Sequence, residues 1–143
     1  MRGVALLATG FGCFAIAGAV AGAGPEAARG TEIYTRRQAC HALQYNRTGP
    51  KHCGLFGRKA GTVPGFDYSP AMMRADFVWD EKTLDRFLAN PPAVVPGTTM
   101  TYAGVADARE RADLIAYLRE ADKSATCRPM ASRGRVALRG QER

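Results

Sequence analysis

The 143-residue sequence predicts an all-α fold, a single domain of three or four short helices joined by long loops. Apolar residues recur at helical spacing in several segments, and few segments alternate as strands do. Positions 44–65, by contrast, have no helical period and are dense in glycine and proline. A loop of this length is unusual unless it wraps something. Because short helices alone bury little apolar area, we expect a large apolar ligand to complete the core.

The first 23 residues are predicted to form a secretory signal peptide. Arg2 supplies a short positive start, and Val4–Val20 is apolar apart from Thr9. Ala21-Gly22-Ala23 then offers a small-residue cleavage site. The alternative is a membrane anchor, but the run is marginal in length and only weakly hydrophobic. We therefore expect export, no stable membrane span, and a domain over 24–123.

Two helices are expected in the first half of this domain. The segment Ala27–Ala39 presents Ile33 and Tyr34 on an apolar face. Gly30, in the same segment, leaves room for another backbone to approach closely. Ser69-Pro70 marks a second helix start, with serine as the N-cap and proline at the first helical position.

A third helix is expected over Glu81–Ala89, with Asp80 as its cap. Its apolar face consists of Leu84, Phe87 and Leu88, at i, i+3 and i+4. Pro91-Pro92 ends this helix, and positions 93–104 are predicted to be a loop.

The clearest helix is expected over Ala108–Asp122. Asp107 and Glu110 make a start that resembles a capping box, with aspartate in place of serine or threonine. The apolar stripe consists of Leu114, Ile115, Leu118 and Ala121, with Tyr117 beside it. Positions 124–143 are arginine-rich and predicted to be a disordered basic tail.

The formal net charge is +7, and loss of Arg2 with the signal peptide would leave +7 − 1 = +6. A basic balance of this size favours acidic partners. No basic motif interleaved with aromatic residues supports nucleic-acid recognition, so we expect no nucleic-acid partner.

The cysteines point to a special site. Removal of the signal peptide with Cys13 leaves three: Cys40, Cys53 and Cys127. Three is an odd number for an oxidising compartment, so one cysteine needs a fate other than an intrachain disulfide. Cys40-His41 matches the end of a Cys-x-x-Cys-His haem-attachment motif, although Arg37 stands at the first cysteine position. Taken alone, such a pair is more often structural.

Further motifs favour haem attachment over a structural role for Cys40-His41, because they follow one another in a fixed order along the chain. They are Thr48-Gly49-Pro50, Gly54-Leu55-Phe56-Gly57-Arg58-Lys59-Ala60-Gly61, Pro64-Gly65-Phe66, Tyr68, Trp79, Thr83-Leu84, Leu88, Asn90-Pro91, Pro96-Gly97-Thr98-Thr99-Met100, Ala103-Gly104 and Arg111-Ala112-Asp113-Leu114-Ile115-Ala116-Tyr117-Leu118. Together they closely resemble the mitochondrial-type family of class I c-type cytochromes over about residues 28–122. The resemblance implies the small cytochrome c fold, with the helices wrapped around one haem.

The resemblance also implies the iron ligands. His41 resembles the proximal ligand, with the carbonyl of Pro50 bonded to its other ring nitrogen. Met100 resembles the distal ligand. His/Met ligation raises the reduction potential and leaves no open iron position, which suits electron transfer and not oxygen chemistry. No catalytic residue is therefore expected.

Other positions resemble the haem surroundings of the family. Those on the propionate side are Arg58, Tyr68, Trp79 and Thr98, which supply the cation and donors that buried carboxylates need. Gly30 and Tyr34 match first-helix positions that cross the last helix at Leu114 and Tyr117.

The chain departs from the family pattern at several positions. Because Arg37 replaces a cysteine, we expect one haem c per chain with a single thioether, through Cys40, as in euglenoid and trypanosome mitochondria. Phe87 stands where the family commonly has a tyrosine near the distal methionine. Lysines are sparse on the usual docking face, and we expect Arg74, Arg86 and Lys82 to substitute for them.

Cys53 and Cys127 are extra to the family pattern and, with Cys40 used by haem, form an even pair. We expect a disulfide that ties the long loop to the end of the last helix, contributing about 3–4 kcal/mol in the chain-entropy model. The alternative is two separate thiols.

The expected function is that of a soluble, monomeric single-electron carrier of the bacterial periplasm. Its partners would be acidic docking patches on a quinol-oxidising complex, a terminal oxidase or a periplasmic dehydrogenase. One alternative is a haem peroxidase or gas sensor, which requires an open iron position. The other is a degenerate member without covalent haem that acts as an interaction module, an interpretation supported by Arg37 alone.

Overall fold

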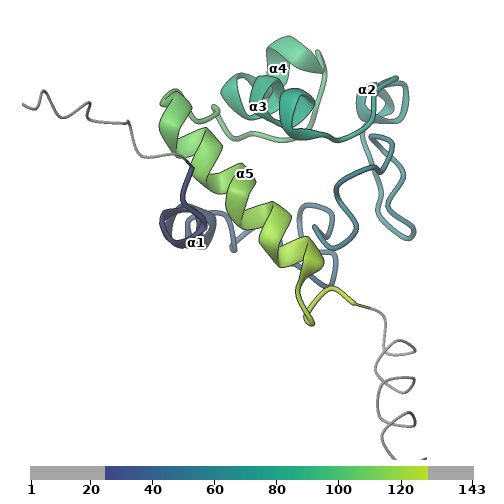
Figure 1. The fold of residues 1–143 in the computed structure, drawn as a ribbon. Coiled ribbons are helices and arrows are strands. Elements are labelled where there is room, and N and C mark those ends of the chain that lie inside the picture. Colours follow the sequence, from purple (N-terminus) through teal and green to yellow (C-terminus); the bar gives the residue numbers. More distant parts are fainter. Residues whose placement is uncertain (1–24, 129–143) are drawn as a thin grey trace, which may run out of the picture.

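The computed structural model of this chain describes residues 25–128. The predicted signal peptide and positions 129–143 of the predicted tail lie outside the described residues. Five helices follow one another, as Figure 1 shows: α1 (Ala27–Thr35), α2 (Pro70–Met73), α3 (Glu81–Ala89), α4 (Pro91–Val94) and α5 (Ala108–Lys123). Within residues 25–128 the extended backbone forms no strand, only an isolated bridge between Lys59 and Val78. The predicted all-α fold class is confirmed.

Helices α1 and α5 cross at close range (Figure 1). A Cβ atom on Gly30 would lie 2.1 Å from the carbonyl oxygen of Asp113 and 2.6 Å from Cβ of Tyr117. Only glycine therefore permits this approach of the two backbones. The rings of Tyr34 and Tyr117 pack beside it with their centres 4.9 Å apart. The crossing expected from the sequence is confirmed.

Helix α1 is shorter than predicted, because it ends at Thr35 and not at Ala39. Three amides after the end of the helix bond three residues back: Arg37 N–H to Tyr34, Gln38 N–H to Thr35 and Cys40 N–H to Arg37. These tighter turns carry the chain away from the helix axis. They lead directly to Cys40.

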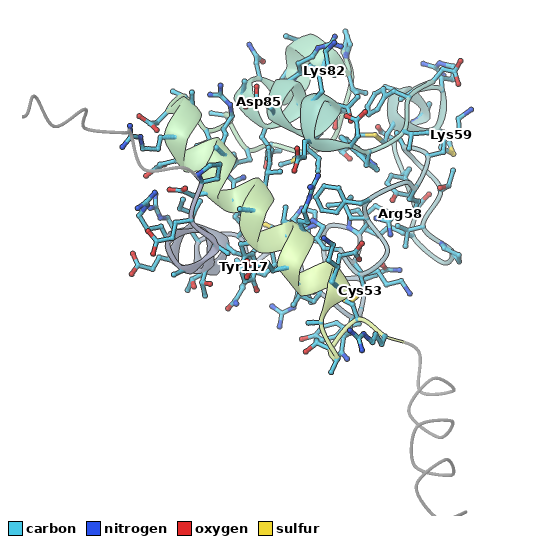
Figure 2. All side chains as sticks on the ribbon, in the orientation of Figure 1. Cys53, Arg58, Lys59, Lys82, Asp85 and Tyr117 are labelled. Carbon is cyan, nitrogen blue, oxygen red and sulfur yellow. A yellow bond between two sulfur atoms is a disulfide. The ribbon has the colours of Figure 1, made fainter. Side chains whose placement is uncertain are left out.

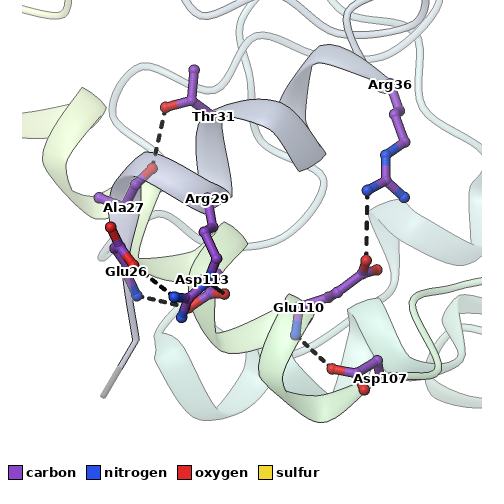
Figure 3. Close-up of polar contacts among 8 residues, drawn as sticks. All are labelled: Glu26, Ala27, Arg29, Thr31, Arg36, Asp107, Glu110 and Asp113. Atoms are coloured by element: carbon purple, nitrogen blue, oxygen red, sulfur yellow. Dashed lines mark hydrogen bonds and ion pairs between the residues drawn. The ribbon is translucent and has the colours of Figure 1, made fainter. Parts of the chain in front are cut away.

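A buried carboxylate fastens the start of α1 to α5, as Figure 3 shows. Asp113 accepts from the backbone N–H of Glu26 at 2.7 Å and from Nε of Arg29 at 2.8 Å. The Arg29 hydrogen bond holds the pKa of Asp113 below its usual value. The carboxylate thus satisfies an amide that precedes the first turn of α1, where no helical carbonyl is available.

We predict that Asp113→Asn lowers the free energy of unfolding by about 1–3 kcal/mol at pH 7, because a buried charged hydrogen bond is lost. Since folding depresses this pKa, the contribution is present above the unfolded value of about 3.9 and is lost as pH falls through the folded pKa. Urea titrations between pH 7 and pH 2 should therefore show the two proteins converging in acid. The exposed Asp67→Asn is the control for loss of a surface carboxylate and should leave the urea midpoint at pH 7 close to that of the wild type. A constant gap at every pH would contradict the prediction.

Helix α3 has the predicted bounds, and its face of Leu84, Phe87 and Leu88 is buried. Asp80 accepts from the Thr83 amide at 2.7 Å, while the Thr83 hydroxyl accepts from the Asp80 amide at 2.8 Å. This reciprocal capping box fixes the start of the helix.

The predicted loop over 93–104 is wrong at its beginning, because Pro91–Val94 forms α4. The side chain of Asn90 caps it by accepting from the Ala93 amide at 3.2 Å. Proline is favourable at a first helical position, so the pair Pro91-Pro92 that ends α3 also begins α4.

The remaining helices begin as expected. Ser69 caps α2, with its hydroxyl accepting from the Met72 amide at 3.2 Å. Asp107 caps α5 in the same way through the Glu110 amide at 2.8 Å, whereas the Glu110 carboxylate lies 3.5 Å from Nη2 of Arg36 (Figure 3). Positions 124–128 continue beyond α5 as hydrogen-bonded turns. None of the helices within residues 25–128 is long and apolar enough to cross a membrane.

Candidate functional site

A cavity of about 310 Å³ lies between the loops, α3 and α5. All eight residues expected to surround or ligate the haem line it: Cys40, His41, Pro50, Arg58, Tyr68, Trp79, Thr98 and Met100. The fold therefore brings together segments that are far apart in the sequence. The wall is otherwise largely apolar and includes Leu55, Met72, Leu84, Phe87, Leu88, Leu114 and Leu118. Such a cavity suits a flat apolar ligand with a few polar groups.

His41 is held in a fixed orientation. Its Nδ1 lies 2.8 Å from the carbonyl oxygen of Pro50. Because a carbonyl can only accept, Nδ1 carries the proton and Nε2 keeps its lone pair. Gly49 packs against the ring so closely that a Cβ there would lie 2.2 Å from Cε1 of His41. Burial lowers the pKa of His41, so the ring is neutral and its Nε2 can bind a metal.

A second histidine, His52, also lines the cavity, and no motif or spacing in the sequence pointed to it. Its ring stacks on that of His41 with the centres 4.5 Å apart and the planes inclined by 16°. Its Nδ1 lies 3.2 Å from the hydroxyl oxygen of Tyr34. Burial, and then the neighbouring His41, hold the pKa of His52 well below its usual value. The cavity is therefore flanked by two neutral imidazoles.

Arg58 lines the cavity, and its guanidinium carries an unsatisfied donor. Its Nη1 and Nη2 donate to the carbonyl oxygens of Cys53 and Lys51, at 3.0 and 3.2 Å. Its Nε is buried and has no hydrogen-bond partner among the described residues. Trp79 lies alongside, because its amide donates to the Arg58 carbonyl at 2.9 Å. A buried, incompletely paired guanidinium is suited to an anionic group of a ligand.

Met100 also lines the cavity. Its amide donates to the hydroxyl of Thr98 at 3.2 Å, which fixes the backbone just before the side chain. Phe87 lines the cavity too, and its ring packs edge to face on that of Trp79 with the ring centres 5.0 Å apart. Met72 is the other methionine among the residues that line the cavity.

No model of a known protein family matches the chain, but individual proteins do. The chain is 43% identical to cytochrome c of Euglena viridis over 97 residues, which cover 66% of this chain and 95% of that protein. The chain belongs to the cytochrome c family. It is also 39% identical to cytochrome c2 of Blastochloris viridis over 114 residues, which cover 77% of this chain and 90% of that protein.

A solved structure supports the same assignment. Cytochrome cH from Methylobacterium extorquens matches with a TM-score of 0.65 and 36% identity, covering 66% of this chain and 98% of that one. The resemblance to class I c-type cytochromes and the cytochrome c fold are thus confirmed. The cofactor of this cytochrome is a c-type haem, and family membership supports an electron carrier.

The residues around the cavity fit that cofactor. A porphyrin needs apolar walls, an iron ligand with a free lone pair, and donors for its propionates. The cavity offers the apolar wall, the oriented Nε2 of His41 and the incompletely paired guanidinium of Arg58 in its wall. Four side chains that line the cavity are of types that can ligate iron: His41, His52, Met72 and Met100.

The cysteines of this cytochrome lie in two places. Cys40 has an exposed free thiol at the rim of the cavity, next to His41. Cys53 and Cys127 are joined as a disulfide, with Cα atoms 5.0 Å apart. Figure 2 labels Cys53 beside the C-terminal end of α5. This bond leaves Cys40 as the free cysteine of residues 25–128.

Proposed function

We propose that this cytochrome is a soluble single-electron carrier of the periplasm, with His41 and Met100 as the axial ligands of its iron. The observation that carries the proposal is that His41 and Met100 line one apolar cavity and that Nε2 of His41 is free and fixed. When bound, haem supplies a one-electron couple between ferrous and ferric iron. Two strong protein ligands suit electron transfer better than the open position that a peroxidase or gas sensor needs.

The protein's own residues prepare the site for that role. Pro50 and Gly49 hold the His41 ring, so the ligand does not reorient when the oxidation state changes. Apolar side chains exclude water, which limits the solvent reorganisation that accompanies electron transfer. Arg58, Tyr68, Trp79 and Thr98 are proposed to hold the propionates. Cys40 is proposed to form the single thioether at the exposed rim, where electrons would enter and leave.

Export is part of the proposal. The predicted signal peptide over residues 1–23 would direct the chain to the periplasm. A disulfide between Cys53 and Cys127 would persist there and would be unusual in a reducing cytoplasm. Cys40 would escape mispairing, since its thiol would be consumed by the haem.

The proposed partners are redox proteins with acidic docking patches. Arg74, Lys82 and Arg86 are exposed, and Figure 2 shows Lys82 on α3. Asp85, on the same helix, is neutralised by Nε of Arg111 at 2.6 Å, so it does not oppose an acidic partner. A basic surface of this kind raises association rates, and it does so less at high salt.

The test is a visible spectrum of the protein expressed with cytochrome maturation machinery. We predict that the reduced protein has a low-spin spectrum and that the absorption band of its pyridine haemochrome lies to the red of that of a two-thioether cytochrome. We also predict that acidified butanone does not extract the haem. Cys40→Ser should release all haem to that solvent. The control is the double variant Cys53→Ser/Cys127→Ser, which should retain its haem in the same solvent. A colourless wild-type protein would refute the proposal, and extractable haem would refute the thioether.

A further inference from the structure

Arg37 is buried at the edge of the cavity, with 7% of its surface exposed. It follows the end of α1, and its carbonyl accepts from the amides of both Cys40 and His41, at 3.0 and 2.9 Å. These bonds join the backbone of Arg37 firmly to the segment that carries the proposed thioether and the proposed proximal ligand. Whatever holds the Arg37 side chain therefore holds that segment too.

The guanidinium of Arg37 lies against an aromatic ring. Its Cζ is 3.8 Å from the centre of the Tyr102 ring. Its Nε and Nη2 are buried, and neither has a hydrogen-bond partner within residues 25–128. Burying a cation without partners is costly, and the face of an aromatic ring offsets part of that cost. Because of that burial, the stacking is worth more here than on the surface.

Tyr102 belongs to the loop that carries Met100. The Met100 amide is bonded to Thr98, and the next hydrogen bond along the loop joins the Val105 amide to the Leu88 carbonyl at 2.8 Å. Between these two points, no hydrogen bond in the described chain involves positions 101–104. The stack of Tyr102 on Arg37 is thus the polar contact that fastens this part of the loop.

We propose that Arg37 and Tyr102 form a latch, a non-covalent link across the mouth of the cavity between the Cys40-His41 segment and the Met100 loop. This inference rests on the proposed function, in which the loop carries Met100 as an axial ligand of the iron. Arg37 occupies the position where the family has its first haem-binding cysteine. A thioether at that position would tie the segment to the cofactor, whereas the latch ties it to the Met100 loop.

The latch has a mechanical consequence. If Met100 ligates the iron, an outward movement of its loop would withdraw that ligand and would also break the contact between Tyr102 and Arg37. Both are therefore positioning residues, since they act on the ligand through the loop. Their removal should raise the population of the open loop, while the closed state and its ligands stay unchanged.

The test compares two tyrosines that both meet an arginine. Tyr102→Leu breaks the latch at a ring that is 41% exposed. Tyr45→Leu is the matched control: this ring is 56% exposed, and Cζ of Arg47 lies 5.4 Å from its centre, away from the cavity. Arg37→Leu and the double variant Arg37→Leu/Tyr102→Leu complete a double-mutant cycle.

Two readouts follow the loop. The first is the rate at which imidazole, at saturating concentration, displaces the sulfur ligand of the ferric protein, seen as loss of the sulfur-to-iron charge-transfer band. The second is hydrogen exchange of the Met100 and Val105 amides, the hydrogen-bonded amides on either side of positions 101–104, and it needs no iron. We expect both rates to rise about three- to tenfold in Tyr102→Leu, the factor that a partly desolvated cation–π contact supplies. Tyr45→Leu should match the wild type, and the double variant should exceed neither single variant.

The outcomes distinguish failure of the latch from failure of the proposed iron ligation. Wild-type rates in Tyr102→Leu, or additive effects in the double variant, would overturn the latch. If the wild type lacks the charge-transfer band, Met100 is not the ligand and the proposed ligation fails. Hydrogen exchange would then still decide the latch, because it reports on the loop whatever binds the iron.

Discussion

Ferric protein carrying Met100→Ala is expected to be high-spin, and its reduction potential is expected to fall by on the order of 0.1–0.3 V. A thioether sulfur stabilises ferrous iron relative to ferric iron, so its loss favours oxidation. Water or an added anion can then reach the vacated position, and the sulfur-to-iron charge-transfer band should disappear. The measurements are a ferric absorption spectrum and a potentiometric titration.

The cavity supplies a matched control for this substitution. Met72 is the other methionine on the wall, buried and with its amide held by Ser69. Met72→Leu keeps the volume and the apolar character of the side chain, so it should lower the free energy of unfolding by less than about 1.5 kcal/mol. The charge-transfer band and the reduction potential should stay unchanged. If Met72→Leu abolished the band while Met100→Ala kept it, the assignment of the two methionines would have to be exchanged.

Elements with local signals were predictable from the sequence. Helix α3 has the predicted bounds, because Asp80, Thr83 and the three apolar residues of its buried face lie within nine positions of one another. The end of α1 was not predictable in the same way, since no glycine or proline marks Thr35 and the change to tighter turns occurs within a polar run. Helix α4 was missed because proline both stops and starts helices, and the cap at Asn90 decides which.

The candidate site was predictable for a different reason. Its residues come from motifs whose order resembles a known family, and the cavity brings those residues together. Features peculiar to this chain had no such signal. His52 lies in a stretch without periodicity, and its stacking on His41 depends on how the loop folds. Arg37 could be noticed only as an absent cysteine, because its contact with Tyr102 joins positions 65 residues apart.

Removing the disulfide is the second change with a large expected effect. Cys53 and Cys127 are separated by 74 positions, so their link constrains most of the described domain in its unfolded state. We predict that Cys53→Ser with Cys127→Ser lowers the free energy of unfolding by about 4 kcal/mol. For a domain of this size that corresponds to a fall in Tm of roughly 15–30 °C. Thermal and urea unfolding followed by circular dichroism would measure both.

The expected loss is specific to stability. Neither Cys53 nor Cys127 lines the cavity, so the spectrum and the potential of the folded double variant should match those of the wild type. Gln44→Ala is the control: it removes the hydrogen bond from Nε2 to the Thr126 carbonyl at 2.7 Å, beside the disulfide, and should cost about 1 kcal/mol or less. Wild-type protein treated with reductant should behave as the double variant does. Alkylation of both cysteines in the unreduced protein, or equal stability of variant and wild type, would show that the end of α5 is held by its hydrogen bonds and not by a covalent link.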